Sequence, residues 1–198
     1  MKGVSPIISA FLIIMIYITL TLAAFQWGVP IIEKNRDFAI IDRAENFLFL
    51  LDKKIERVVK LGSTEEIIFM LPGKLYINPT NDTINLQIMT RGAIYYPENY
   101  TCIVENCDTY LNITQVDVFF APKVRSHRFM DRAIIKYLLE PREFKKGNDI
   151  YTVDILGSGN SLVATSNSKL IIRSPGLNSS VVGGGKLIKV KINISIES

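Results

Sequence analysis

The first part of the sequence is a long stretch without a single charged side chain. It extends from Gly3 to Ile32, and within it the run Ile7–Phe25 consists mostly of isoleucine, leucine, methionine and alanine. Roughly 20 residues of α-helix cover a hydrocarbon core about 30 Å thick, and a helix satisfies its own backbone polar groups in lipid. We therefore expect this stretch to form a helix that can cross a membrane once.

The remainder of the chain has the composition of an ordinary folded protein. The 198 residues include 48% hydrophobic and 21% charged residues, which excludes a mainly disordered chain. The 23 basic residues are interleaved with 19 acidic ones, so the net charge is only +4 and we expect no nucleic-acid partner. Two cysteines and one histidine leave little material for a protein-bound metal site, and no cofactor is expected.

Two kinds of processing fit the N-terminus. An ordinary secretory signal ends in a small-x-small site, which Thr21-Leu22-Ala23 matches poorly, so cleavage after Ala23 or Ala24 is the less favoured alternative. A different order occurs at Lys2-Gly3, which is followed directly by Val4-Ser5-Pro6-Ile7-Ile8. Here a charged leader and a glycine precede the apolar helix, with a serine placed to cap it and a proline tolerated in its first turn.

This order resembles the class III signal peptide of archaeal type IV pilins, pilin-like proteins and archaellins. The resemblance implies that a class III signal peptidase cuts between Gly3 and Val4, so that residues 1–3 form the leader and the helix stays on the mature protein. Bacterial type IV pilins usually carry glutamate at the fifth mature position, here Ile8, whereas many archaeal members lack it. The resemblance also implies a pilus assembly platform as a partner, and assembly through contacts between copies of the helix.

An amphipathic helix is expected to follow over residues 38–61. Apolar side chains recur there at three- and four-residue spacing, which predicts one face packed on the rest of the protein and leaves the other for subunit contacts. We assign one helix to residues 4–61, and Gly62 suits the position directly after its end. Gly28-Val29-Pro30 predicts a kink or an interruption between the two halves of this helix. The apolar stripe consists of Ile41, Ala44, Leu48, Leu51, Ile55, Val58 and Val59.

After Gly62 the apolar period changes from 3.6 to 2 residues, which indicates strands and turns. The clearest strand is Lys186–Ile196, in which apolar and polar side chains alternate, so that it is half buried. We predict an α+β chain, in which a long N-terminal apolar and then amphipathic helix is followed by an all-β sandwich- or barrel-like head at residues 62–198. The other expected strands are Glu66–Leu71, Leu75–Ile77, Ile84–Ile88, Ala93–Tyr96, Asp117–Ala121, Ala133–Leu139, Tyr151–Leu156 and Leu170–Arg173.

The head contains five Asn-x-Ser/Thr triplets without a central proline. They begin at Asn81, Asn99, Asn112, Asn178 and Asn193. Such triplets are acceptors for N-glycosylation, so they favour an extracellular head and a single-pass helix whose N-terminus lies inside the cell. The lysines and arginines that flank the apolar run do not by themselves favour this orientation.

The two cysteines, Cys102 and Cys107, lie close together in a segment rich in asparagine, threonine and tyrosine. In an outside compartment this spacing favours a small disulfide loop over two free thiols. A metal site here would need two further ligands from elsewhere, and His127 is the only histidine.

No motif in the sequence supports an enzyme. His127 has Asp131 nearby, but Val124–Arg128 is interpreted as a basic, exposed turn. Gly157–Asn160 and Gly183–Gly185 are interpreted as hairpin turns, because a phosphate-binding loop should open a helix. Two pairs of carboxylates are neighbours only in sequence, Glu65 with Glu66 and Glu140 with Glu143.

With the resemblance to archaeal type IV pilins, the sequence favours a structural subunit of an archaeal type IV pilus-like surface filament. The resemblance implies adhesion or another filament role, with the head facing solvent, an S-layer or another surface. Before assembly the subunit would reside in the cell membrane. The alternative is a membrane-anchored, non-polymerising extracytoplasmic binding protein, such as a minor pilin-like subunit or the stator component that holds a filament to the envelope. Because both proteins would carry the same apolar helix, the sequence leaves this choice open.

Overall fold

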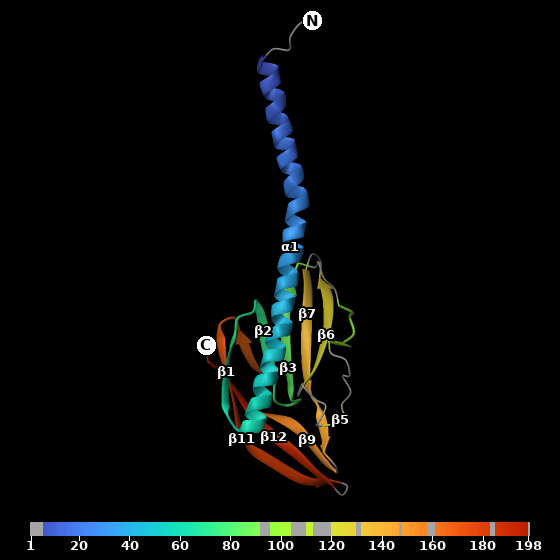
Figure 1. Cartoon of the computed structure of the whole chain (residues 1–198), viewed down its shortest axis with the longest axis vertical. Helices are drawn as coiled ribbons and strands as arrows, with labels where there is room; N and C mark the ends of the chain where they lie inside the picture. The colour runs from blue at the N-terminus through green and yellow to red at the C-terminus, as the bar shows by residue number, and fades with distance from the viewer. Residues whose placement is uncertain are drawn as a thin grey trace.

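The fold is taken from a computed structural model that describes residues 6–91, 96–103, 110–112, 120–129, 132–146, 148–157, 161–182 and 185–197. One helix, α1 (Pro6–Leu61), precedes all the strands. Its N-terminal half projects away from the strands, and its C-terminal half lies along them (Figure 1). The predicted α+β fold, a long helix followed by a β-rich head, is confirmed.

The strands that the structure describes in the head form two six-stranded sheets. The first has the order β1-β11-β12-β9-β8-β5, and the second has the order β10-β2-β3-β7-β6-β4. Neighbouring strands are antiparallel, except for the parallel pairs β12–β9 and β5–β8. The strands are β1 (Thr64–Phe69), β2 (Gly73–Asn78), β3 (Thr83–Thr90), β4 (Thr101–Cys102), β5 (Tyr110–Asn112), β6 (Phe120–Phe129), β7 (Arg132–Pro141), β8 (Glu143–Lys146), β9 (Asp149–Leu156), β10 (Leu162–Thr165), β11 (Ser168–Val182) and β12 (Gly185–Glu197).

The C-terminal half of α1 is part of the core of the head. The predicted apolar stripe is buried along its length, with Val59 only partly covered, and it belongs to the same buried cluster as the inward side chains of both sheets. Phe47 of the helix, for example, packs edge-on against Phe69 of β1 with ring centroids 5.3 Å apart. Burial of this stripe gives the helix a fixed position on the sheets, which intrinsic helix propensity alone would not provide.

The helix ends where the sequence predicts but is not interrupted where the sequence allows it. Gly62 has a φ of 65°, and its N–H donates to the carbonyl of Val58 at 3.0 Å, the usual geometry of a glycine that stops a helix. Pro30 lies inside the continuous helix Pro6–Leu61, so of the two predicted outcomes the interruption is wrong, and the kink stays a prediction. The neighbours of Pro30 are exposed, so the carbonyl that loses its N–H partner is not confined in a packed core.

Most predicted strands are confirmed with small shifts of their ends, but β6 differs from the prediction. Val124–Arg128 is not a turn; it lies within β6 and pairs with β7 over its whole length. The core face of β6 includes Ser126, a polar residue, which hides the apolar alternation that marks a strand. The expected strand Ala93–Tyr96 lies outside the described residues except for Tyr96, which is not in a strand. Residues 117–119 of the expected strand Asp117–Ala121 also lie outside them, and Phe120 begins β6.

Candidate functional site

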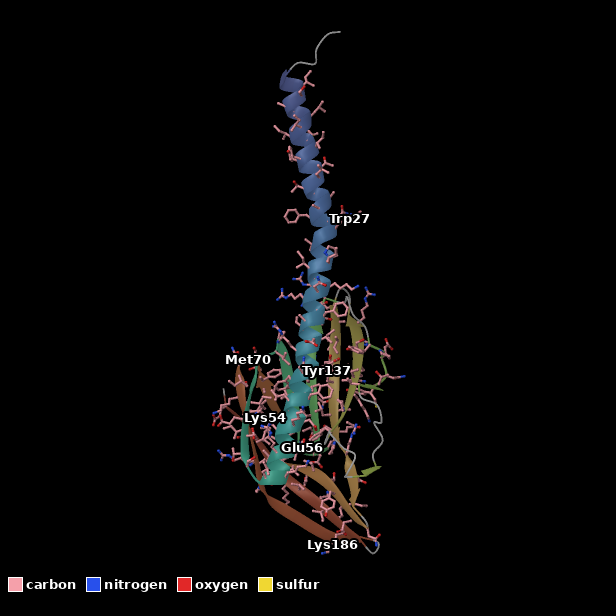
Figure 2. The ribbon with its side chains drawn as sticks, in the orientation of Figure 1. Trp27, Lys54, Glu56, Met70, Tyr137 and Lys186 are labelled. Carbon is pink, nitrogen blue, oxygen red and sulfur yellow. The ribbon has the colours of Figure 1, made fainter. Side chains whose placement is uncertain are left out.

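The N-terminal half of α1 exposes large apolar side chains on all sides. Between Ile8 and Ile32 these side chains range from 44% exposed at Val29 to 79% exposed at Trp27. Trp27 lies on the part of the helix that projects beyond the head (Figure 2). A soluble surface does not present a continuous apolar cylinder of this kind, so the segment requires lipid or other protein around it.

The two threonine hydroxyls within this apolar segment have partners inside the helix itself. The hydroxyl of Thr19 donates to the carbonyl of Met15, and the hydroxyl of Thr21 donates to the carbonyl of Tyr17, each at 2.8 Å. Such bonds remove the need for water around a hydroxyl in an apolar medium. By length and composition, this helix is able to cross a membrane.

Charged side chains begin on α1 where the head begins. Glu33, the first of them, forms an ion pair with Arg91, which directly follows β3. One turn further on, the buried carboxylate of Asp37 accepts a hydrogen bond from the backbone N–H of Arg91 at 3.0 Å. An open cavity of about 390 Å³ lies at this junction, and Val29, Ile32 and Met89 contribute apolar side chains to its wall. The junction therefore combines an exposed apolar end with a charged attachment to the head.

Two contacts near the C-terminal end of α1 hold the helix on the head. The buried carboxylate of Asp52 accepts the backbone N–H of Phe120 at 2.8 Å, at the start of β6. Burial lowers the pKa of the nearby Arg142 guanidinium below its ordinary value, and the negative charge of Asp52 opposes that change. Lys54 donates to Glu65 of β1 at 2.8 Å, and this bond lowers the pKa of the Glu65 carboxyl.

A cluster of Glu45, Tyr96 and Tyr137 lies between the middle of α1 and the second sheet. The Tyr96 hydroxyl donates to Glu45 at 2.9 Å, and its ring packs edge-on against the ring of Tyr137 at 6.5 Å. Burial, together with the Glu45 carboxylate, raises the pKa of Tyr96 to about 12. Burial also raises the pKa of Tyr137. Both phenols therefore stay neutral at physiological pH, and the cluster is a structural contact of the helix with β7.

The predicted processing and disulfide sites lie partly outside the described residues. Gly3 and Val4 both lie there, so the cleavage site stays a prediction. Cys102 is in β4 and carries no free thiol. Its predicted partner Cys107 lies outside the described residues, so the bond between the two stays a prediction as well.

Three of the five predicted glycosylation acceptors lie on strands of the first sheet, and the other two lie in loops. Asn81, in the turn between β2 and β3, is exposed, as are Asn99 and, on β12, Asn193. Asn112 is in β5 and Asn178 is in β11, and the structure describes the backbone alone at these two positions. The three exposed acceptors are accessible to a modifying enzyme.

The residues considered for catalysis are not brought together. His127 is exposed on β6, while Asp131 lies outside the described residues. Glu65 pairs with Lys54 and Glu66 pairs with Lys169, so this pair of carboxylates does not converge. Glu140 pairs with Lys123 of the neighbouring strand instead of Glu143. Within the described ranges no group of three side chains is arranged to hold a metal ion.

Sequence reasoning missed the acidic side chains that attach the helix to the head. Asp37 precedes the buried Ile41 by four residues, and Asp52 follows the buried Leu48 by four residues. An acidic residue in phase with an apolar stripe is therefore the signal that would have found them. The chain matches no protein-family model, no curated protein and no solved structure.

Proposed function

We propose that this protein is a structural subunit of an archaeal type IV pilus-like surface filament. The observation that carries the proposal is the contrast within one continuous helix. Its C-terminal half is part of the core of the head, whereas the large apolar side chains from Ile8 to Ile32 stay outside the buried cluster and are exposed. The resemblance of the N-terminal motif to the class III signal peptide supports the same proposal.

The physical basis of assembly is burial of the projecting helix half. At 1.5 Å per residue, residues 8–32 extend about 37 Å, enough to cross a bilayer core of about 30 Å. When the helix leaves lipid, it can avoid water only by packing against copies of itself. Burial contributes about 25 cal/mol for each Å² of apolar surface, so this contact supplies most of the cohesion of the filament.

Processing and covalent modification follow from the same proposal. A class III signal peptidase cuts between Gly3 and Val4, so N-terminal sequencing of the mature protein should begin at Val4. A start at Ala24 or Phe25 would contradict the pilin-like assignment.

The head lies outside the cell, where Cys102 and Cys107 form a disulfide and the exposed acceptor asparagines carry glycans. Alkylation of surface protein without reduction should label neither cysteine, and full labelling of both would contradict this placement.

The function is tested by placing a charge on the projecting helix. Ile13→Lys and Leu20→Lys should abolish filaments, because each buries an unpaired ammonium group among apolar helices. Met70→Lys is the matched control: Met70 is 69% exposed on the head, and this substitution should leave filaments intact. Ile13→Val, which keeps the position apolar, should also assemble. Electron microscopy of material sheared from cells scores each variant, and an antibody to the folded head verifies that the variants are present.

The same helix supports a second candidate, a membrane-anchored binding protein that does not polymerise. The observation that favours it is that the exposed apolar half is long enough to remain in lipid permanently. If Ile13→Lys and Leu20→Lys leave the number of filaments unchanged, the filament proposal is wrong and the anchored protein takes its place.

A further inference from the structure

The second sheet has an outer face that points away from the helix and the core. Along β7 the side chains alternate, so that Ile135, Tyr137 and Leu139 are buried and the residues between them are only partly covered. Tyr137 lies beside α1 (Figure 2). Its neighbour Lys136 therefore stands on the opposite face, because successive side chains of a strand point to opposite sides of the sheet.

Three cations stand in one row across this outer face. Lys74 of β2 is opposite Gln87 of β3, Gln87 is opposite Lys136 of β7, and Lys136 is opposite Arg125 of β6. Lys136 and Arg125 are thus direct cross-strand partners of like charge. Such a pair destabilises a sheet unless an anion lies between the two groups.

The described residues provide no acidic partner within hydrogen-bonding distance for these cations. Elsewhere on the same two strands, Lys123 forms an ion pair with Glu140. In contrast, the Arg125 guanidinium packs over the ring of Tyr100, with its central carbon 4.4 Å from the ring centroid. Glu98 lines a hollow beside Arg125 and Lys136 but is exposed and forms no ion pair with either among the described residues. Among the residues that the structure describes, the row therefore retains net positive charge.

Two hollows flank the Arg125–Lys136 pair. One has a volume of about 230 Å³, and its wall combines Tyr76 and Tyr100 with the amides of Asn85 and Gln87. The other has a volume of about 200 Å³ and is lined by residues that include Glu98 and His127. Both hollows include Arg125 and Lys136, so the two cations form a shared wall between two adjacent depressions.

We propose that this outer face binds an acidic polysaccharide, with a sugar carboxylate held between Arg125 and Lys136. The inference rests on the proposed extracellular placement of the head and deepens its adhesive role, but it does not require the helix to polymerise. A carboxylate between the two cations removes their repulsion and accepts charge-assisted hydrogen bonds from both. The contact with Tyr100 keeps the guanidinium in place, so little side-chain freedom is lost on binding.

The surroundings of the two cations favour a sugar over a peptide or a free phosphate. Tyr76 and Tyr100 are half-buried aromatic rings against which a pyranose ring can pack, and Asn85 and Gln87 offer both donors and acceptors to sugar hydroxyls. A row of cations across neighbouring strands about 4.8 Å apart also suits a polymer with several carboxylates better than a single small anion.

The test uses the full chain in a non-ionic detergent and a carboxylated probe, an oligogalacturonate, in titration calorimetry. Neutral maltodextrin, poly-L-glutamate and inorganic phosphate serve as comparison probes. Oligogalacturonate should bind, and each of Lys136→Gln and Arg125→Gln should weaken its binding about tenfold, since each removes a charge-assisted hydrogen bond. Lys186→Gln is the matched control: Lys186 is exposed at the start of β12, at the far end of the head (Figure 2), and its loss should change binding less than twofold.

Thermal unfolding without sugar adds a readout that simple damage to the fold would not produce. Lys136→Gln should raise the midpoint of unfolding while it weakens sugar binding, because the like-charge pair is removed. Equal affinity of the Lys136→Gln and Lys186→Gln proteins for oligogalacturonate would overturn the proposal. It would also fall if poly-L-glutamate, phosphate or maltodextrin bound as tightly as oligogalacturonate. Because the assay needs no filament, its failure is independent of a failure of assembly in the shearing experiment.

Discussion

Acidic side chains along one side of α1 connect the helix to the sheets at three levels. Asp37 accepts the backbone N–H of Arg91, Glu45 accepts the hydroxyl of Tyr96, and Asp52 accepts the backbone N–H of Phe120. These positions are about two helical turns apart, so they lie on the same side of the helix as the buried stripe. They fix the register of the helix on the head, which apolar contacts alone specify less sharply.

Asp52→Ala should lower the free energy of unfolding of the head by about 3 kcal/mol, because it leaves a buried N–H without its acceptor and the Arg142 guanidinium without its counter-charge. Lys53→Ala is the control, since Lys53 is exposed on the adjacent position, and it should change stability by about 0.5 kcal/mol or less. Urea unfolding in detergent measures both. Equal effects of the two substitutions would show that the contact of Asp52 does not stabilise the head.

Stability should fall at alkaline pH because of Tyr96. Its pKa is raised to about 12 from an ordinary value near 10, so the folded state holds this proton more tightly than the unfolded state. The stabilisation is therefore complete below about pH 10 and is lost as the pH rises toward 12. In Tyr96→Phe the decline over this range should be shallower, with the remainder due to Tyr137 and other groups. An unchanged slope of unfolding free energy against pH would contradict the role of Tyr96.

At the scale of elements, α1 is one helix in two environments. Periodicity predicted both, because a charge-free run and a three-and-four stripe are distinct patterns. The effect of Pro30 was not predictable from the sequence. An internal proline removes one backbone hydrogen bond, and the helix then either continues through it or ends there, depending on the surrounding structure. Here the head fixes the C-terminal half of the helix, and the helix continues through Pro30.

Neighbouring leucines on α1 test the helix–sheet core. Leu51 is 1% exposed and Leu50 is 48% exposed. Leu51→Ala should lower the free energy of unfolding by about 2–5 kcal/mol, because it leaves a cavity between the helix and the sheets. Leu50→Ala, the same chemical change on the exposed side, should cost about 0.5 kcal/mol or less. Urea unfolding of the two proteins compares them, and a larger loss for Leu50→Ala would place the wrong face of the helix in the core.

The strands were predictable where burial alternates, as in β3, β7 and the C-terminal part of β12. They were not predictable where a polar residue occupies the core face, as Ser126 does in β6, where its hydroxyl accepts the backbone N–H of Tyr96 at 2.9 Å. The pairing of β10 with β2 and of β12 with β9 joins segments far apart in the chain, and no local pattern specifies such partners.

At the scale of the whole molecule, one part of the candidate site was predictable from the sequence and the other part was not. The apolar helix was found from the sequence because lipid and helix bundles both select long uncharged runs. The attachment of the helix at Asp37 and Asp52, and the row of cations from Lys74 to Arg125, depend on register between distant segments and needed the structure. Together these features describe a head attached to a helix whose projecting half is apolar and exposed.

The central claim is that the apolar N-terminal segment, residues 4–25, is the polymerisation element. Electron cryo-microscopy of filaments sheared from intact cells tests it most directly. The account predicts filaments that contain this protein, with the apolar helices packed together at the centre and excluding water, and with the β-rich heads outside. Recovery of the protein wholly in the membrane fraction after shearing, with no filament that carries it, would contradict the account.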